Sequence, residues 1–121
     1  MKLLMDTNFL MDLSRFRIEL SEIHDLLLEP IELCVLSNSL AELNFLSKKA
    51  KHGRYAKLAL LLIKNNHLKI LDSPYDVDKA ILASADKSTI VATNDMELRK
   101  QLRKNGIKTI YLRARKHLAI D

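Results

Sequence analysis

Short apolar runs alternate along this chain with longer stretches that carry apolar residues at helical spacing. Five of the runs are rich in Leu, Ile and Val and are bounded by polar residues, as the strands of a buried sheet are. They cover residues 2–5, 31–36, 68–71, 89–92 and 108–112. The repeating order of strand and helix is typical of a parallel sheet with helices on both faces. We therefore expect an α/β fold, a doubly wound sandwich with right-handed connections.

The stretches between the runs predict helices, and proline and glycine mark several of their ends. Pro30 and the pair Asn105-Gly106 are typical helix terminators, whereas Pro74 behind a serine favours a helix start. The residues after 112 are expected to form a basic tail. The expected helical stretches reach to about residue 29, with a break near 14–16, and then cover 39–49, 54–65, 74–85 and 95–104.

Length and composition indicate one compact domain over residues 1–121. The chain is 48% hydrophobic and 29% charged, with two Gly and two Pro, as in a helix-rich globular protein. No apolar run approaches the roughly 20 residues that cross a bilayer, and the apolar start is too short for a signal peptide. We expect a cytoplasmic protein with no membrane partner. Cys34 is the only cysteine, which excludes an internal disulfide and a thiolate zinc site.

The chain is basic, which is compatible with an anionic partner. The formal net charge is +5 and the isoelectric point is near 9.4, values that suit a nucleic-acid-binding protein as well as a merely soluble one. Basic residues cluster in the sequence, either as solvated faces or as phosphate contacts. The residues that we single out as candidate RNA contacts are Lys48, Lys49, Arg113, Arg115 and Lys116.

Acidic residues recur just after the expected strands. Ligands of an open parallel sheet bind outside the carboxyl ends of its strands, so these carboxylates are expected to meet at one edge. Carboxylates gathered in this way repel each other unless a cation lies among them. Mg²⁺ and Mn²⁺ prefer oxygen ligands, activate water and neutralise charge on a phosphate. The acids concerned are Asp6, Glu42, Asp76, Asp78 and Asp95.

Helix capping offers another interpretation of most of these acids. Ser39 and Glu42 have the spacing of a capping box, and Asp95 or its neighbour Asn94 fits a simple N-cap. Asp76 and Asp78 fall in an expected first turn, where the helix dipole favours acids. Asp6 fits this interpretation least, because no obvious capped helix follows it. The recurrence of acids at one edge favours a metal site.

Four segments together resemble the motifs of the PIN-domain family of ribonucleases. Residues 5–10 (MDTNFL) are similar to the opening strand and turn of that family, and 39–43 (SLAEL) to its second motif. Residues 78–85 (DKAILASA) and 93–95 (TND) are similar to the third and fourth. The resemblance covers essentially the whole chain. It implies a three-layer α/β/α sandwich with a central five-stranded parallel sheet and divalent-metal-dependent endoribonuclease activity.

The resemblance also implies roles for individual residues. Asp6, Glu42, Asp78 and Asp95 are the expected catalytic acids and ligands of Mg²⁺ or Mn²⁺. Asp78 is preferred to Asp76 as the third acid because it aligns with the helix of small and apolar residues that follows. The residues expected to support these carboxylates are Asn8, Thr93 and Asp76.

Two branches of the family suit the chain, and their partners differ. The ending 110–118 resembles ribosomal-RNA-processing PIN proteins that occur as stand-alone domains in archaea, whereas the compact size also suits VapC toxins, which pair with an antitoxin. The apolar segment 58–63 predicts a helix that is largely buried or that contacts a partner, including a second copy in a homodimer.

Two other functions are compatible with parts of the pattern. One is a PIN-like RNA-binding or scaffold protein without catalysis, although all four acids are present. The other is a receiver-type signalling domain, which needs an acid pair after the first strand and a lysine after the fifth. Here Asp6 stands alone, and Leu112-Arg113-Ala114 takes the place of the lysine.

Overall fold

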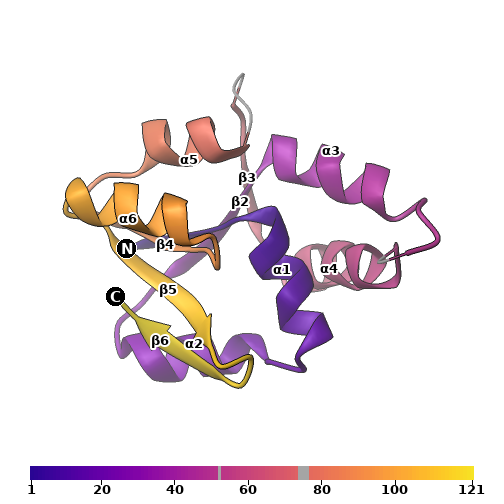
Figure 1. Ribbon diagram of the computed structural model, residues 1–121, viewed down its shortest axis with the longest axis horizontal. Helices are drawn as coiled ribbons and strands as arrows, with labels where there is room; N and C mark the ends of the chain where they lie inside the picture. The colour runs from indigo at the N-terminus through magenta and orange to yellow at the C-terminus, as the bar shows by residue number, and fades with distance from the viewer. Residues whose placement is uncertain (52, 74–76) are drawn as a thin grey trace.

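The computed structural model describes residues 1–51, 53–73 and 77–121. Strands and helices alternate in the expected order (Figure 1). Asp76, expected to support the site, and Pro74, expected to start a helix, lie outside the described residues. The elements are β1 Lys2–Met5, α1 Thr7–Arg15, α2 Leu20–Leu27, β2 Glu32–Leu36, α3 Ser37–Leu46, α4 Gly53–Asn65, β3 Lys69–Leu71, α5 Val77–Ser84, β4 Thr89–Ala92, α6 Met96–Lys104, β5 Lys108–Arg113 and β6 His117–Ile120.

The strands form one sheet in the order β3-β2-β1-β4-β5-β6. β1 lies in the middle and pairs in parallel with β2 and with β4, so that Leu4 is opposite Cys34 on one side and Val91 on the other. The pairs formed among the first five strands in the chain are all parallel. The expected parallel core of five strands is therefore confirmed.

Alternate residues of the central strands pack into two separate cores, one on each face of the sheet. Leu3 and Met5 of β1 join the core that also holds buried residues of α1, α2, α3 and α4. Leu4 points to the opposite face and joins the core built from α5 and α6. Figure 1 shows α5 and α6 together on one side of the sheet. The three-layer sandwich expected from the sequence is confirmed.

The sixth strand corrects the expected basic tail and the five-stranded count. β6 pairs antiparallel with β5, with Leu118 opposite Leu112. The turn between β5 and β6 contains Ala114 and Arg115, both in the left-handed region with φ of 52° and 57°. The sequence lacks the glycine that usually marks such a turn, which concealed the hairpin. The Asp121 side chain follows β6 and forms ion pairs with two arginines of α6, Arg99 and Arg103.

The apolar helix α4 is buried along one face only. Ala59 and Ile63 lie in the core, whereas Leu58 and Leu61 are 41% and 52% exposed. Part of the apolar segment 58–63 is thus available to solvent or to another molecule. No helix in the described part of the chain is both long and apolar enough to cross a membrane.

Candidate functional site

A pocket lies at the carboxyl ends of the strands, where the strand order reverses. β1 is followed in space by β2 on one side and by β4 on the other, and ligands of doubly wound sheets bind at this switch point. The pocket has a volume of about 830 Å³. Two cations, Arg15 and Lys79, are among its lining residues. Its carboxylates are Asp6, Asp12, Glu42, Asp78 and Asp95.

Asp6 is the most deeply placed of these acids, with 6% of its surface exposed. It follows β1 and is the N-cap of α1, accepting a hydrogen bond of 2.7 Å from the backbone N–H of Phe9. Its other carboxylate oxygen accepts a hydrogen bond from the hydroxyl group of Thr93. The expectation that Asp6 fits capping least is therefore wrong, because α1 begins at Thr7 directly behind it. Capping and a place in the pocket coexist in this residue.

Burial raises the pKa of Asp6 from 3.8 to about 6, against the lowering effects of its hydrogen bonds from Thr93 and Phe9. The negative charges of Asp78 and Asp95 raise it further. These two acids therefore lie within electrostatic reach of Asp6. Such a group is stabilised in its charged form by a cation placed among the three carboxylates.

Thr93 and Asp95 connect β4 with α6 beneath the pocket. Thr93 is fully buried, and its Oγ1 accepts a hydrogen bond of 3.1 Å from the backbone N–H of Asp95. Asp95 is the N-cap of α6, and its Oδ1 accepts from the N–H groups of Glu97 and Leu98. The capping interpretation of Asp95 is confirmed. An ionised carboxylate has two oxygens and several lone pairs, so capping leaves it able to bind a cation as well.

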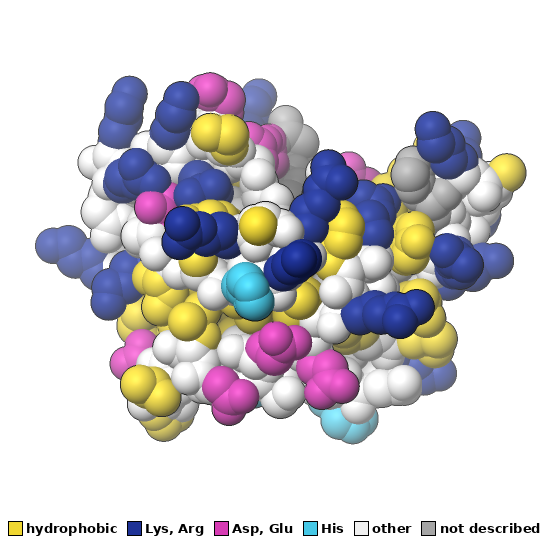
Figure 2. Space-filling view, turned by 60° about the horizontal axis from the view of Figure 1, so that its bottom comes forward, with side chains coloured by type: hydrophobic (Ala, Val, Ile, Leu, Met, Phe, Trp, Pro, Cys, Tyr) yellow, Lys and Arg dark blue, Asp and Glu magenta, His cyan; other side chains and the backbone are white. Residues whose placement is uncertain are grey.

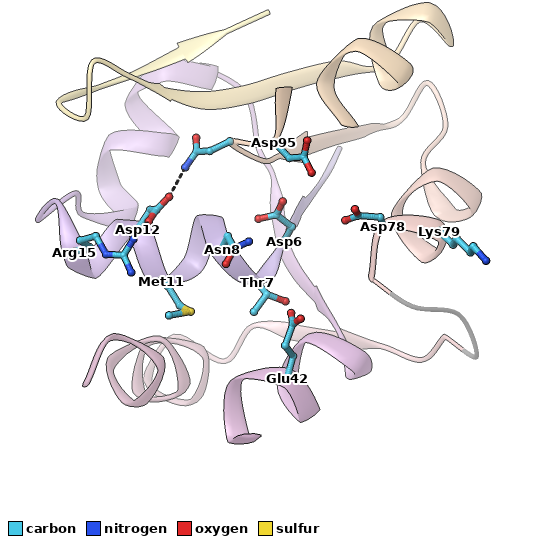
Figure 3. Close-up of a pocket in the computed structure, with 11 residues that line it drawn as sticks. Asp6, Thr7, Asn8, Met11, Asp12, Arg15, Glu42, Asp78, Lys79 and Asp95 are labelled. Carbon is cyan, nitrogen blue, oxygen red and sulfur yellow. Dashed lines mark hydrogen bonds and ion pairs between the residues drawn. The ribbon is translucent and has the colours of Figure 1, made fainter. Parts of the chain in front are cut away.

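Glu42 reaches the pocket from α3, and the capping box expected around it does not form. α3 begins at Ser37, two residues before the serine of that box, and its N-cap Leu36 makes no side-chain hydrogen bond. The Glu42 side chain points toward the Thr7 hydroxyl group and the central space of the pocket (Figure 3). Because α3 begins earlier than expected, Glu42 lies in its second turn and is too far along the helix to cap the first N–H groups.

Asp78 reaches the pocket from α5, on the other face of the sheet from α3. It lies in the first turn of α5 and points toward Asp6, whereas the neighbouring Lys79 amine points away from the pocket (Figure 3). Asn8 lines the pocket beside Asp6 as expected of a supporting residue, but the described hydrogen bonds of Asp6 go to Phe9 and Thr93 instead. Among the residues that the structure describes, Thr93 is the one that orients Asp6 by a side-chain hydrogen bond.

Asp12, Arg15 and Asn94 are pocket residues that the sequence does not predict. Asn94 accepts a hydrogen bond of 2.7 Å from the backbone N–H of Leu112 and donates one of 2.8 Å to Asp12. Asp12 also accepts a hydrogen bond of 3.2 Å from Arg15. The spacing of Asp12 and Arg15 on α1 is the only signal that the sequence offers, because it is that of a helical ion pair. Asn94 fits a helix cap and belongs to the motif-like segment 93–95, but neither predicts its hydrogen bonds to Leu112 and Asp12.

The expected RNA contacts lie outside the pocket. Lys48 and Lys49 are exposed in the turn after α3, and Arg115 and Lys116 are exposed in the turn between β5 and β6. Arg113 ends β5 and is also exposed. Figure 2 shows that Lys and Arg side chains are spread across this view of the surface rather than gathered in one patch. A role of these five residues in RNA binding stays a prediction.

The chemistry of the pocket suits a hard divalent cation. Its potential ligands are oxygens of carboxylates, amides and hydroxyls, without histidine or cysteine, as Mg²⁺ and Mn²⁺ prefer. The buried hydroxyl groups of Thr7 and Ser39 have no hydrogen-bond partner within the described part of the chain. Among residues 1–51, 53–73 and 77–121, no group of three or more aspartate, glutamate, histidine or cysteine side chains is arranged so that it could hold a metal ion. Mg²⁺ needs no such group, since it keeps several waters and often uses one or two carboxylates directly.

The fold and the pocket define a doubly wound α/β domain with a carboxylate site at its switch point. Comparisons with known proteins agree with this class. The family model described as "PIN like domain" matches residues 3–115. The sequence is 36% identical over 126 residues to ribonuclease VapC4 of Methanocaldococcus jannaschii, covering 98% of this chain and 95% of that protein. The chain therefore belongs to the PIN-like domain family.

A solved structure supports the same fold. The chain matches the PIN domain endonuclease Utp24 with a TM-score of 0.80 and 23% sequence identity, covering 99% of this chain and 90% of that one. The receiver-type alternative is wrong, because receiver domains have the strand order 2-1-3-4-5, whereas here β1 lies between β2 and β4.

Proposed function

We propose that this chain is an endoribonuclease that hydrolyses RNA phosphodiester bonds with the help of Mg²⁺ or Mn²⁺. Membership of the PIN-like family and the 36% identity to a protein named as a ribonuclease support the nuclease activity. The observation that carries the proposal is the convergence of Asp6, Glu42, Asp78 and Asp95 on one pocket from four different helices or helix starts (Figure 3).

Each carboxylate has a distinct role in this proposal. Asp6 and Asp95 hold the cation directly, because both are fixed by hydrogen bonds at helix starts. Glu42 and Asp78 are exposed and reach the cation directly or through water. A bound divalent ion supplies an activated water and neutralises charge on the phosphate. Thr93 holds the Asp6 carboxylate in one orientation, as partners of metal ligands commonly do.

In this proposal the positive net charge of the protein serves RNA binding, and the acidic residues of the pocket serve cleavage. The pocket acids repel phosphate as long as no cation is present, whereas the net charge of +5 attracts RNA to the surface as a whole. The candidate contacts Lys48, Lys49, Arg113, Arg115 and Lys116 bind the RNA backbone away from the cleaved bond in this proposal.

The biological role follows one of the two branches expected from the sequence. The identity to ribonuclease VapC4 supports the VapC-type role over RNA processing. In that role an antitoxin protein is the partner, and the exposed Leu58 and Leu61 of α4 offer an apolar surface to it or to a second copy. A cytoplasmic location and a single domain over residues 1–121 complete the proposal.

Cleavage of labelled RNA tests the proposed function. Single-stranded and structured RNA are incubated with Mg²⁺, Mn²⁺ or EDTA and with wild type, Asp6→Asn and Asp95→Asn. Asp25→Asn is the matched control, because Asp25 is an exposed acid of α2 outside the pocket. Metal-dependent cleavage that falls at least about 100-fold in both pocket variants and not in the control supports the proposal. Binding without cleavage by wild type would favour the non-catalytic alternative.

A further inference from the structure

Arg15 brings a guanidinium group to one end of an acidic pocket. It lies in the last turn of α1, and its Nη1 donates a hydrogen bond of 3.2 Å to Asp12. The guanidinium carbon lies 5.1 Å from the centre of the Tyr55 ring. The side chain is 32% exposed, so part of it faces the solvent in the pocket. A guanidinium group offers planar, paired donors that match a phosphate.

A chain of hydrogen bonds fixes the position of Arg15. Asp12 receives the Arg15 donor on one oxygen and the Asn94 amide on the other. Asn94 is in turn anchored by the backbone N–H of Leu112 in β5. Asp12 and Asn94 therefore link the guanidinium group to the sheet. Neither of them belongs to the four acids that are proposed to bind the metal. A group held in this way loses little conformational entropy when it binds a ligand.

Arg15 lies at one end of the pocket, displaced from Asp6 along α1. Asp12, which holds the guanidinium, lies six residues beyond Asp6, about 9 Å along a helix that rises 1.5 Å per residue. Figure 3 shows Arg15 and Lys79 at opposite ends of the pocket, with the four carboxylates between them. An RNA strand whose scissile phosphate lies among those carboxylates therefore passes Arg15 with a neighbouring phosphate.

We propose that Arg15 binds an RNA phosphate next to the scissile one and so sets the position of the strand in the pocket. Asp12 and Asn94 are positioning residues for this contact. The proposal rests on the proposed function, because it takes RNA as the ligand of the pocket. A purely structural role of Arg15, as a cation near the helix C-terminus, makes no distinction between RNA phosphates.

RNA binding in a variant that does not cleave tests the contact. In the Asp95→Asn background with Mg²⁺, Arg15→Met is compared with Lys108→Met, which also removes one positive charge and keeps an unbranched apolar stem. Lys108 is exposed at the start of β5, where the parallel strands begin, whereas the pocket lies where they end. Arg15→Met is expected to weaken binding of a single-stranded oligonucleotide roughly 10-fold and to reduce the salt slope of log K by about 0.7. Arg15→Lys, which keeps the charge but not the paired donors, should lie in between.

A substrate series locates the phosphate. An oligonucleotide cut at one known bond is synthesised with an uncharged methylphosphonate at each other position in turn. One replacement should weaken binding to the Arg15-containing protein about 10-fold and leave binding to Arg15→Met unchanged, as a double-mutant cycle requires. The proposal is overturned if every replacement affects both proteins equally, or if Arg15→Met binds like Lys108→Met. If wild type does not cleave RNA, but Arg15→Met still binds RNA more weakly than Lys108→Met does, the proposed function alone is contradicted.

Discussion

The hydroxyl group of Thr93, at the end of β4, donates a hydrogen bond to the carboxylate of Asp6, at the end of β1. The two residues are far apart in the sequence and meet because β1 and β4 are neighbours in the sheet. The same hydroxyl accepts the backbone N–H of Asp95. One buried hydroxyl group thus links the carboxylate of the first of the four acids to the backbone of the last.

The buried charge of Asp6 is expected to reduce the stability of the metal-free protein. Because the folded pKa of about 6 lies above the value of 3.8 in the unfolded chain, the free energy of unfolding falls as the pH rises from about 4 through 6. The cost at pH 7 is about 2–3 kcal/mol. Asp6→Asn should be more stable than wild type by about this amount at pH 7 in EDTA, measured by chemical denaturation. The two proteins should converge below about pH 4.

Lower stability of Asp6→Asn than of wild type at pH 7 in EDTA would contradict this explanation. It would mean that the caps and hydrogen bonds of the charged carboxylate outweigh its burial. Asp25→Asn controls for the change in net charge. Because Asp25 is exposed, this variant should be about as stable as wild type at pH 7 in EDTA.

The Thr93 hydroxyl is expected to matter more for metal affinity than its size suggests. Thr93→Val keeps the shape but removes both hydrogen bonds, at a cost of about 1–3 kcal/mol in stability. The pKa of Asp6 should rise further, since the Thr93 hydrogen bond lowers it. Mn²⁺ affinity, measured by titration calorimetry, should fall about 10- to 100-fold. Thr93→Ser restores the hydroxyl and should recover most of the affinity, and equal affinities of the Val and Ser variants would refute the role.

Asn94 is expected to be a structural link of the pocket. Asn94→Ala leaves the Leu112 N–H and one oxygen of Asp12 without their partner, which should lower the free energy of unfolding by about 2 kcal/mol. Asn65→Ala, at the exposed end of α4, is the control and should change it by less than about 0.5 kcal/mol. Urea denaturation of both variants decides the point, and equal effects would show that the hydrogen bonds of Asn94 contribute nothing.

Much of the fold could be predicted because short runs rich in Leu, Ile and Val alternate with stretches of helical spacing. The bounds expected for the first and fourth runs, 2–5 and 89–92, are those of β1 and β4. β6 could not be predicted in the same way, because its pairing depends on two non-glycine residues in left-handed conformation, Ala114 and Arg115. Such a turn is stabilised by the hairpin around it rather than by local preference.

The candidate site could likewise be predicted only in part. Asp6, Glu42, Asp78 and Asp95 could be found because each follows a strand, and parallel strands end at one edge. The contact between Asn94 and Asp12 joins residues 82 positions apart, and no periodicity in the sequence predicts it. Capping also proved compatible with a place in the pocket, since Asp6 and Asp95 both cap helices and line the pocket.

Binding of Mn²⁺ to the pocket tests the central claim most directly. In ¹H–¹⁵N spectra of the folded protein, substoichiometric Mn²⁺ should broaden the backbone signals around Asp6, Glu42, Asp78 and Asp95 before all others. Asp6→Asn and Asp95→Asn should each lose most of this selective broadening, whereas Asp25→Asn should retain it. Broadening centred elsewhere in the chain, or unchanged broadening in both pocket variants, would contradict the claim that these carboxylates form a metal site.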